Sequence, residues 1–147
     1  PTTMTALSWT VREHGSEPAE EPTPITRSQD AIRLFAAVLR QQTRECFVIL
    51  PLNTRSRTTG VRLVSMGSLN ASIVHPREVF REAITAEAAS IIVAHNHPSG
   101  DPTPSPEDIA VTKVLVAAGK LLGIPVLDHI IIGKGCSASM KDLDLMT

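Results

Sequence analysis

The sequence predicts an α/β domain in which a mixed β-sheet is flanked by helices. Apolar runs of strand length alternate with segments whose apolar residues recur every three or four positions, as in amphipathic helices. The chain has 147 residues, 42% of them hydrophobic, which is enough for one core and too few for two comfortable domains. We therefore expect a single domain over residues 25–147.

The first part of the chain divides into a polar tail, a helix and a hairpin. Residues 1–24 are polar, contain prolines and have no hydrophobic period, so we expect a flexible tail. Residues 28–42 carry apolar side chains at helical spacing. Two apolar runs, 45–52 and 61–66, are separated by a polar turn and predict a hairpin. Pro51 cannot donate a ladder hydrogen bond, so it indicates an edge, a bulge or the end of regular pairing.

The second part alternates strands and helices. A short extended piece is expected at 71–74, followed by a helix over 76–84 with Val79, Phe80, Ala83 and Ile84 on its inner side. A strand at 90–94 leads into His95. A helix over 109–122, with its start at Ser105 and its end at Gly123, precedes a strand at 126–132.

The stretch HNHPSGDPTPSPED at 95–108 carries most of the chemical information. If the strand continues through His95 and His97, the two imidazoles face the same way, because residues two apart in a strand share a face. Ser105 and Asp108 lie three apart at a helix start, with a proline between them. Four polar groups are therefore expected to converge.

Two imidazoles and one carboxylate are the three protein ligands typical of a catalytic zinc site. His95, His97 and Asp108 are the candidate ligands, and Zn²⁺ is the expected cofactor. Hydrolysis also needs a carboxylate that takes a proton from water, and Glu45 serves if its strand lies beside His95. Ser105 is a candidate hydrogen-bond donor to the developing oxyanion.

Each of these residues also has a plainer interpretation. Ser105 and Asp108 can form a capping box without any metal, and Glu45 can be an ordinary acid at a strand end. Asp101, before a proline, is a competing ligand but is typical of a turn. For Asp128, His129 and His75 we expect local hydrogen bonding, and for Cys46 and Cys136 we expect buried free thiols. The histidine pair at a strand end, by contrast, has little structural reason to exist.

The composition restricts the classes of function. The net charge is −1 and the pI is near 6.6, so there is no broad basic balance to support DNA binding. No apolar run is long enough to span a membrane and no leader is visible, so we expect a cytoplasmic protein. The metallo-β-lactamase pattern fails because Ser99 and Gly100 stand where it needs an aspartate and a histidine. The helical zincin pattern is also absent.

The spacing of His95, His97, Ser105 and Asp108 matches the JAMM signature of the MPN-positive (JAB) metalloprotease superfamily. Three longer segments resemble the bacterial RadC family: VHPREVF at 74–80, AHNHPSGDPTPSPED at 94–108 and LLGIPVLDHIIIG at 121–133. The resemblance covers residues 28–140, and its motifs are highly specific. Before Glu45 the sequence shows a polar segment and one helix where RadC proteins usually carry a helix-hairpin-helix region.

The resemblance implies a JAB/MPN-type fold, which is cytidine-deaminase-like, and zinc held by His95, His97 and Asp108. It also implies that Glu45 is the motif glutamate and Ser105 the motif serine. The expected activity is that of a peptidase or isopeptidase, with a peptide or protein-conjugate substrate that includes ubiquitin-like conjugates. The alternative is a non-catalytic interaction module associated with DNA repair or mobile elements. The sequence leaves the oligomeric state open, a dimer included.

Overall fold

The computed structural model describes residues 21–67 and 74–146, so the first 20 residues of the tail predicted over 1–24 and most of the extended piece at 71–74 lie outside the described residues. The elements in chain order are β1 (Thr23–Pro24), α1 (Ser28–Leu39), β2 (Cys46–Leu52), β3 (Arg57–Thr58), β4 (Arg62–Met66), α2 (Pro76–Thr85), β5 (Ser90–Asn96), α3 (Pro106–Leu122), β6 (Val126–Ile132) and β7 (Ser137–Ser139).

The main sheet has five strands in the order β4-β2-β5-β6-β7. Strands β5 and β6 run parallel, while the other neighbouring pairs are antiparallel. The crossover from β5 to β6 passes through α3, as a parallel connection requires. The predicted mixed sheet flanked by helices is confirmed. Strands β1 and β3 form a separate two-stranded sheet at the start of the domain.

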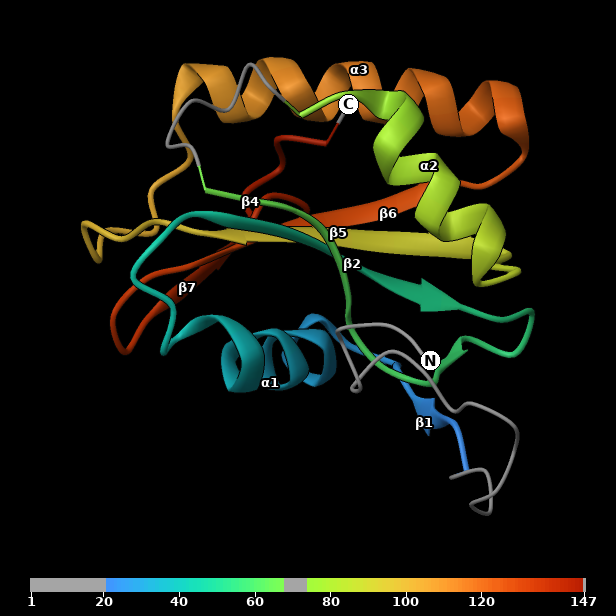
Figure 1. Ribbon diagram of the computed structural model, residues 1–147, viewed down its shortest axis with the longest axis horizontal. Coiled ribbons are helices and arrows are strands. Elements are labelled where there is room, and N and C mark those ends of the chain that lie inside the picture. The colour runs from blue at the N-terminus through green and yellow to red at the C-terminus, as the bar shows by residue number, and fades with distance from the viewer. Residues whose placement is uncertain (1–20, 68–73, 147) are drawn as a thin grey trace.

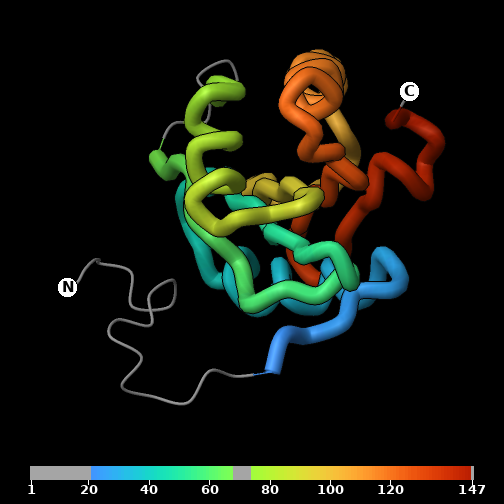
Figure 2. Tube along the Cα trace, turned by 90° about the vertical axis from the view of Figure 1, so that its right-hand side faces the viewer, coloured from blue at the N-terminus to red at the C-terminus, as the bar shows by residue number. Residues whose placement is uncertain are grey.

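Helices cover both faces of the main sheet (Figure 1). Helix α1 lies on one face, and α2 and α3 lie next to each other on the other face, an arrangement that is also clear along the second axis (Figure 2). Successive side chains of strand β5 alternate between the two faces of the sheet, so this strand contributes to both core clusters. Ile92 and Ala94 belong to the core cluster under α1, whereas Ile91 and Val93 belong to the cluster under α2 and α3.

Pro51 lies in a strand with a neighbour on each side, not in an edge strand. Strand β4 pairs with β2 only along residues 46–49, so Pro51 has no partner in β4 and pairs with Ile91 of β5. The missing N–H is tolerated because pairing with β4 has already ended at this point. The predicted end of regular pairing is therefore confirmed on the β4 side.

Two predictions about burial are wrong in part. Ile84 was expected on the inner side of α2, but its side chain is 58% exposed, while Val79, Phe80 and Ala83 are buried. Ile84 follows Ala83 by about 100° around the helix, which turns it toward solvent. Cys46 is a buried free thiol as expected, whereas Cys136 is only half-buried because it lies in the turn before β7.

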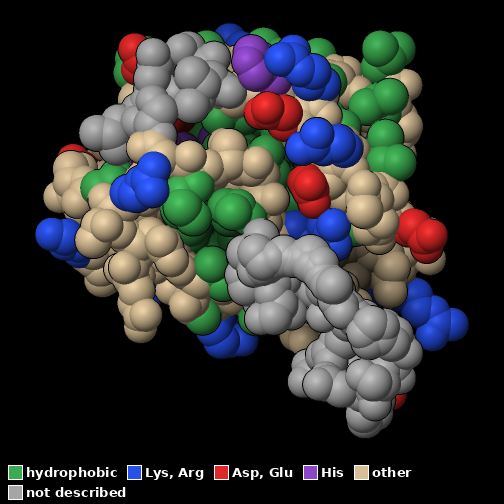
Figure 3. All heavy atoms as spheres, viewed as in Figure 1, with side chains coloured by type: hydrophobic (Ala, Val, Ile, Leu, Met, Phe, Trp, Pro, Cys, Tyr) green, Lys and Arg blue, Asp and Glu red, His purple; other side chains and the backbone are tan. Residues whose placement is uncertain are grey.

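The described surface agrees with the near-neutral composition. On the face viewed in Figure 3, acidic and basic side chains lie close to one another, and hydrophobic side chains are scattered between them. Within the described ranges, no helix combines the length and hydrophobicity that crossing a membrane would require.

Candidate metal centre

His95 and His97 lie at the carboxyl end of β5. His95 is the next-to-last residue of the strand, and its parallel pairing with β6 continues to Asn96. The N–H of His97 then bonds the carbonyl oxygen of Ile132 at 2.9 Å, which holds the chain in line past the end of the strand. The two Nε2 atoms are 3.0 Å apart. The predicted convergence of the imidazoles on one face is confirmed.

Asp108 approaches both imidazoles from the first turn of α3. Its Oδ1 lies 3.1 Å from Nε2 of His95, and its Oδ2 lies 3.1 Å from Nε2 of His97. Burial disfavours the charged carboxylate, but the hydrogen bonds of the two histidines, the charge of His95 and the backbone hydrogen bond of Ser105 outweigh this effect. The pKa of Asp108 is consequently held well below its usual range.

The same helix start also forms the capping box that the sequence allowed. Ser105 Oγ accepts a hydrogen bond from the N–H of Asp108 at 3.0 Å, and Asp108 Oδ2 accepts one from the N–H of Ser105 at 2.8 Å. The plainer and the chemical interpretations of Asp108 are therefore compatible. Capping fixes the carboxylate at the helix end, and the capped carboxylate is the one that meets the histidines.

Glu45 reaches the group from the neighbouring strand. Strand β2 pairs antiparallel with β5 in a register that sets Phe47 opposite His95, so the residue just before β2 lies beside His97. Glu45 Oε2 is 3.8 Å from Nε2 of His95, which is close enough for an electrostatic interaction but too long for a direct hydrogen bond. Burial raises the pKa of Glu45 above its usual value.

Asn96 fixes the backbone on both sides of Glu45. Its Oδ1 accepts a hydrogen bond from the N–H of Cys46 at 2.7 Å, and its Nδ2 donates to the carbonyl oxygen of Arg44 at 3.0 Å. Asn96 is 3% exposed. The sequence alone assigned no role to this residue. A polar side chain at the end of a largely apolar strand is the signal that could have identified it.

His129 of β6 lies behind His95. The Nε2 atom of His129 is 2.8 Å from Nδ1 of His95, and its Nδ1 atom is 2.5 Å from Oγ1 of Thr112 in α3. Burial, followed by the charge of His95, lowers the pKa of His129 well below its usual value. The side chain of His129 is hydrogen-bonded, as expected, but its partners are not local. They lie 34 and 17 residues away along the chain, and one of them is a candidate ligand, which the sequence could not show without the order of the strands.

The other competing residues have local roles. Asp101 Oδ1 accepts hydrogen bonds from the N–H and the hydroxyl of Thr103, as expected for a turn. Asp128 accepts hydrogen bonds from the backbone of His129 and the hydroxyl of Ser139. His75 precedes α2 as its N-cap residue but makes no side-chain capping bond.

The donor set fits a zinc ion. Ligand bonds of 2.0–2.1 Å at tetrahedral angles separate two donor atoms by about 3.3 Å, close to the 3.0 and 3.1 Å found between His95, His97 and Asp108. Nδ1 of His97 is 2.8 Å from the carbonyl oxygen of Asp101, which can only accept, so this nitrogen carries the proton and a neutral ring keeps a lone pair on Nε2. Glu45, His95 and His97 also form a group whose donor atoms lie within 4.8 Å of one another.

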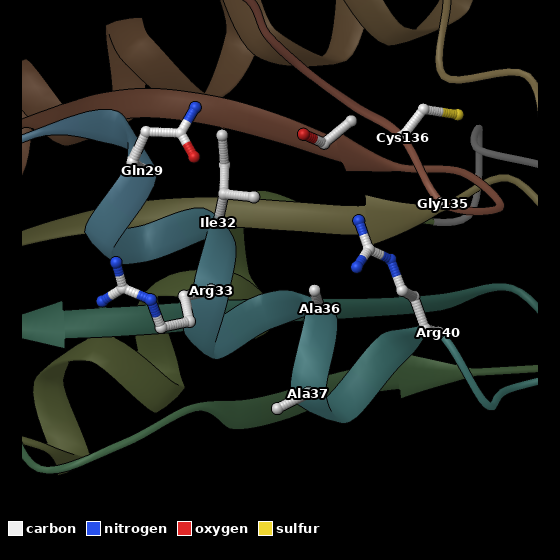
Figure 4. A pocket seen from close by; sticks show the side chains of 9 residues that line it. Gln29, Ile32, Arg33, Ala36, Ala37, Arg40, Gly135 and Cys136 are labelled. Carbon is white, nitrogen blue, oxygen red and sulfur yellow. The ribbon is translucent and has the colours of Figure 1, made fainter.

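A separate cavity lies on the opposite side of the sheet. It has a volume of about 470 Å³ and lies between α1 and the turn that leads to β7. The Arg40 side chain rises into it from the end of α1, and Gly135 and Cys136 lie on the other side (Figure 4). None of the residues that line this cavity belongs to the candidate metal centre.

Comparison with known families agrees with this geometry. The RadC-like JAB domain matches residues 25–145, which is most of the chain. The chain belongs to this family. The RadC and JAB resemblance of the sequence is thereby confirmed, together with the fold that it implied.

Curated relatives of this RadC-like JAB domain carry the name UPF0758 protein, which specifies no activity. One from Shouchella clausii is 54% identical over 118 residues, covering 80% of this chain and 51% of the relative. One from Methanosarcina mazei is 54% identical over 124 residues, covering 84% of this chain and 54% of the relative. The chain therefore spans about half the length of the curated relatives it matches.

Proposed function

We propose that this RadC-like JAB domain is a zinc-dependent hydrolase of amide or isopeptide bonds, a metallopeptidase of the JAMM type. The observation that carries the proposal is the convergence of Glu45, His95, His97 and Asp108 from three separate elements. Capping alone explains the position of Asp108 but not the presence of two imidazoles against its carboxylate. The JAB superfamily to which the domain belongs includes zinc-dependent isopeptidases.

His95, His97 and Asp108 would hold the zinc. Asp108 is 3.1 Å from each imidazole, whereas Glu45 is 3.8 Å from the nearer one, so Asp108 is the better third ligand. Zinc at this position would supply a Lewis acid and lower the pKa of a water molecule toward about 7. The three ligands come from the end of β5 and the start of α3, which are fixed by sheet pairing and by capping.

Glu45 would act as the proton carrier. Its carboxylate lies 3.8 Å from Nε2 of His95, farther than the carboxylate of Asp108, so a water molecule bound beside the ligands can contact it. In amide hydrolysis the carboxylate takes a proton from the attacking water and then delivers it to the leaving nitrogen. Asn96 holds the backbone on both sides of this group, so that the carboxylate keeps its position through the transfer.

Ser105 would stabilise the oxyanion. Its Oγ accepts the capping hydrogen bond from Asp108, and an acceptor role leaves the hydroxyl proton free for another partner. A donor at this position can bond the carbonyl oxygen of the substrate as negative charge develops on it. The substrate we propose is a peptide or a protein conjugate, with ubiquitin-like conjugates as one class.

The test compares three proteins loaded with zinc: the unaltered chain, Glu45→Gln and Glu107→Gln. Peptide and isopeptide libraries serve as substrates, and zinc content is measured on each protein. Glu107 is an exposed acid in the same first turn of α3, so its variant controls for the loss of a charge near the site. We expect Glu45→Gln to bind zinc without turnover, and Glu107→Gln to behave as the unaltered chain.

Two results would contradict the proposal. Turnover by Glu45→Gln would refute the role of Glu45 as base. Absence of turnover by the unaltered chain across both libraries, together with a salt-dependent affinity for DNA, would instead favour the non-catalytic module associated with DNA repair or mobile elements.

A further inference from the structure

His129 connects α3 to the first histidine of the candidate metal centre. It has no solvent exposure, and both of its ring nitrogens have side-chain partners. Sheet pairing of β6 uses the backbone and needs neither contact. A buried polar ring in a largely apolar strand, held on one side by Thr112 and on the other by His95, therefore calls for another explanation.

The hydroxyl of Thr112 can set the direction of the hydrogen bonds. Its Oγ1 lies 2.7 Å from the carbonyl oxygen of Asp108, which can only accept. When the hydroxyl donates to this carbonyl, its oxygen must accept from His129, so Nδ1 of His129 carries the proton. Nε2 of His129 is then an acceptor, and it takes the proton of Nδ1 of His95.

The opposite direction is incompatible with metal binding. If the Thr112 hydroxyl donates to His129, then Nε2 of His129 donates to His95, and a neutral His95 carries its own proton on Nε2. A protonated ring nitrogen has no lone pair for a metal. Nε2 of His95 is the atom that faces the other candidate ligands. Only the first direction therefore leaves it free to bind.

We propose that His129 is a positioning residue that fixes His95 as the Nδ1–H tautomer, and that Thr112 orients His129 in turn. The inference rests on the proposed zinc site and adds the residues that prepare its most buried ligand. Histidine ligands usually donate their other N–H to a carboxylate, a carbonyl or water. Here a neutral imidazole takes that place, and full burial keeps it uncharged.

The first test measures zinc affinity by competition with a chromophoric chelator. Loss of such a supporting partner typically weakens metal binding about 10–100-fold, which is the effect expected for His129→Leu. His129→Gln should recover most of this loss, because its amide oxygen can accept from His95. Thr112→Val should weaken binding in the same direction. Thr58→Val is the matched control, since Thr58 is equally buried but lies in the small sheet.

The second test needs no substitution. Two-bond proton–nitrogen correlation spectra of the zinc-loaded chain, labelled with ¹⁵N-histidine, show which ring nitrogens carry protons. We expect His95 to be protonated on Nδ1 and metallated on Nε2, and His129 to carry one proton, on Nδ1. This measurement tests the predicted tautomers of His95 and His129 even if His129→Leu does not fold.

Either of two results would overturn the inference. One is zinc bound through Nδ1 of His95, and the other is an affinity of folded His129→Leu within about twofold of the unaltered chain. If the unaltered chain binds zinc and these results are found, the inference fails while the proposed function stands. If the unaltered chain binds no zinc, both fail.

Discussion

Replacing Asn96 with alanine should destabilise the domain and misplace Glu45 at the same time. The substitution removes the acceptor for the N–H of Cys46 and the donor for the carbonyl oxygen of Arg44. Both bonds are short, at 2.7 and 3.0 Å, and the amide lies in a buried position. The Arg44 carbonyl lies before β2, which begins at Cys46, and its other contact is a weak one with the Cys46 thiol at 3.6 Å.

The expected magnitude follows from these two groups. Leaving a buried polar group without a partner costs about 1–3 kcal/mol. Because the Arg44 carbonyl is only partly buried and water can reach it, we expect a total loss of about 2–4 kcal/mol in the free energy of unfolding. For a domain of this size the melting temperature should fall by roughly 8–15 °C.

The assay is urea unfolding of the variant beside Asn53→Ala. Asn53 also accepts two backbone hydrogen bonds, from Arg55 at 2.8 Å and Arg57 at 3.1 Å, but its side chain lies in an exposed turn. Water can replace those bonds, so its loss should cost less than about 1 kcal/mol. Equal destabilisation by the two variants would refute the reasoning. Zinc affinity should change little in Asn96→Ala, whereas turnover should fall.

Three further predictions concern other parts of the domain. Burial raises the pKa of Asp128, so the folded state binds its proton more tightly than the unfolded state, and stability is lost as pH rises from about 4 through the folded pKa. The free energy of unfolding of Asp128→Asn, measured by urea unfolding at a series of pH values, should therefore rise relative to that of the unaltered chain across this pH window. A difference between the two proteins that does not change with pH would contradict this. Alanine favours helices, but Gly119→Ala should destabilise the domain by about 1–3 kcal/mol, because the new Cβ would lie 2.5 Å from the carbonyl oxygen of Ile124. A variant that is more stable in urea unfolding would refute this prediction. Chelation of zinc should lower the melting temperature of the zinc-loaded protein, by the equivalent of about 2.7 kcal/mol at a free zinc concentration of 100 times Kd, and an unchanged melting curve would count against a bound ion.

Local patterns in the sequence were sufficient for the elements that depend on local interactions. Helix α3 begins after Ser105 and ends at Gly123, where the backbone is left-handed, because the capping box and the glycine act within a few residues of the helix. The apolar runs predicted β2, β5 and β6. Strand β7, with the sequence Ser-Ala-Ser, was missed because its pairing with β6 comes from tertiary contacts and not from β propensity.

The candidate site depended on strand order, which the sequence does not encode locally. Glu45 had no distinguishing feature until β2 was placed beside β5, and the register of that pair decides that it reaches His95. The contacts of Asn96 and His129 with the site could not be predicted for the same reason. Their partners lie 50 and 34 residues away along the chain, in neighbouring strands. Thr112 was accessible in principle, because it lies four residues after Asp108 on the same helix face.

The most direct test of the account is the zinc content and affinity of the purified chain beside His97→Ala and His75→Ala. His75 precedes α2 and is not part of the cluster, so its variant controls for the loss of any histidine. The account predicts one zinc per chain for the unaltered protein and for His75→Ala, and a large loss of zinc for His97→Ala. An unaltered chain without stoichiometric zinc, or equal zinc in the two variants, would contradict it.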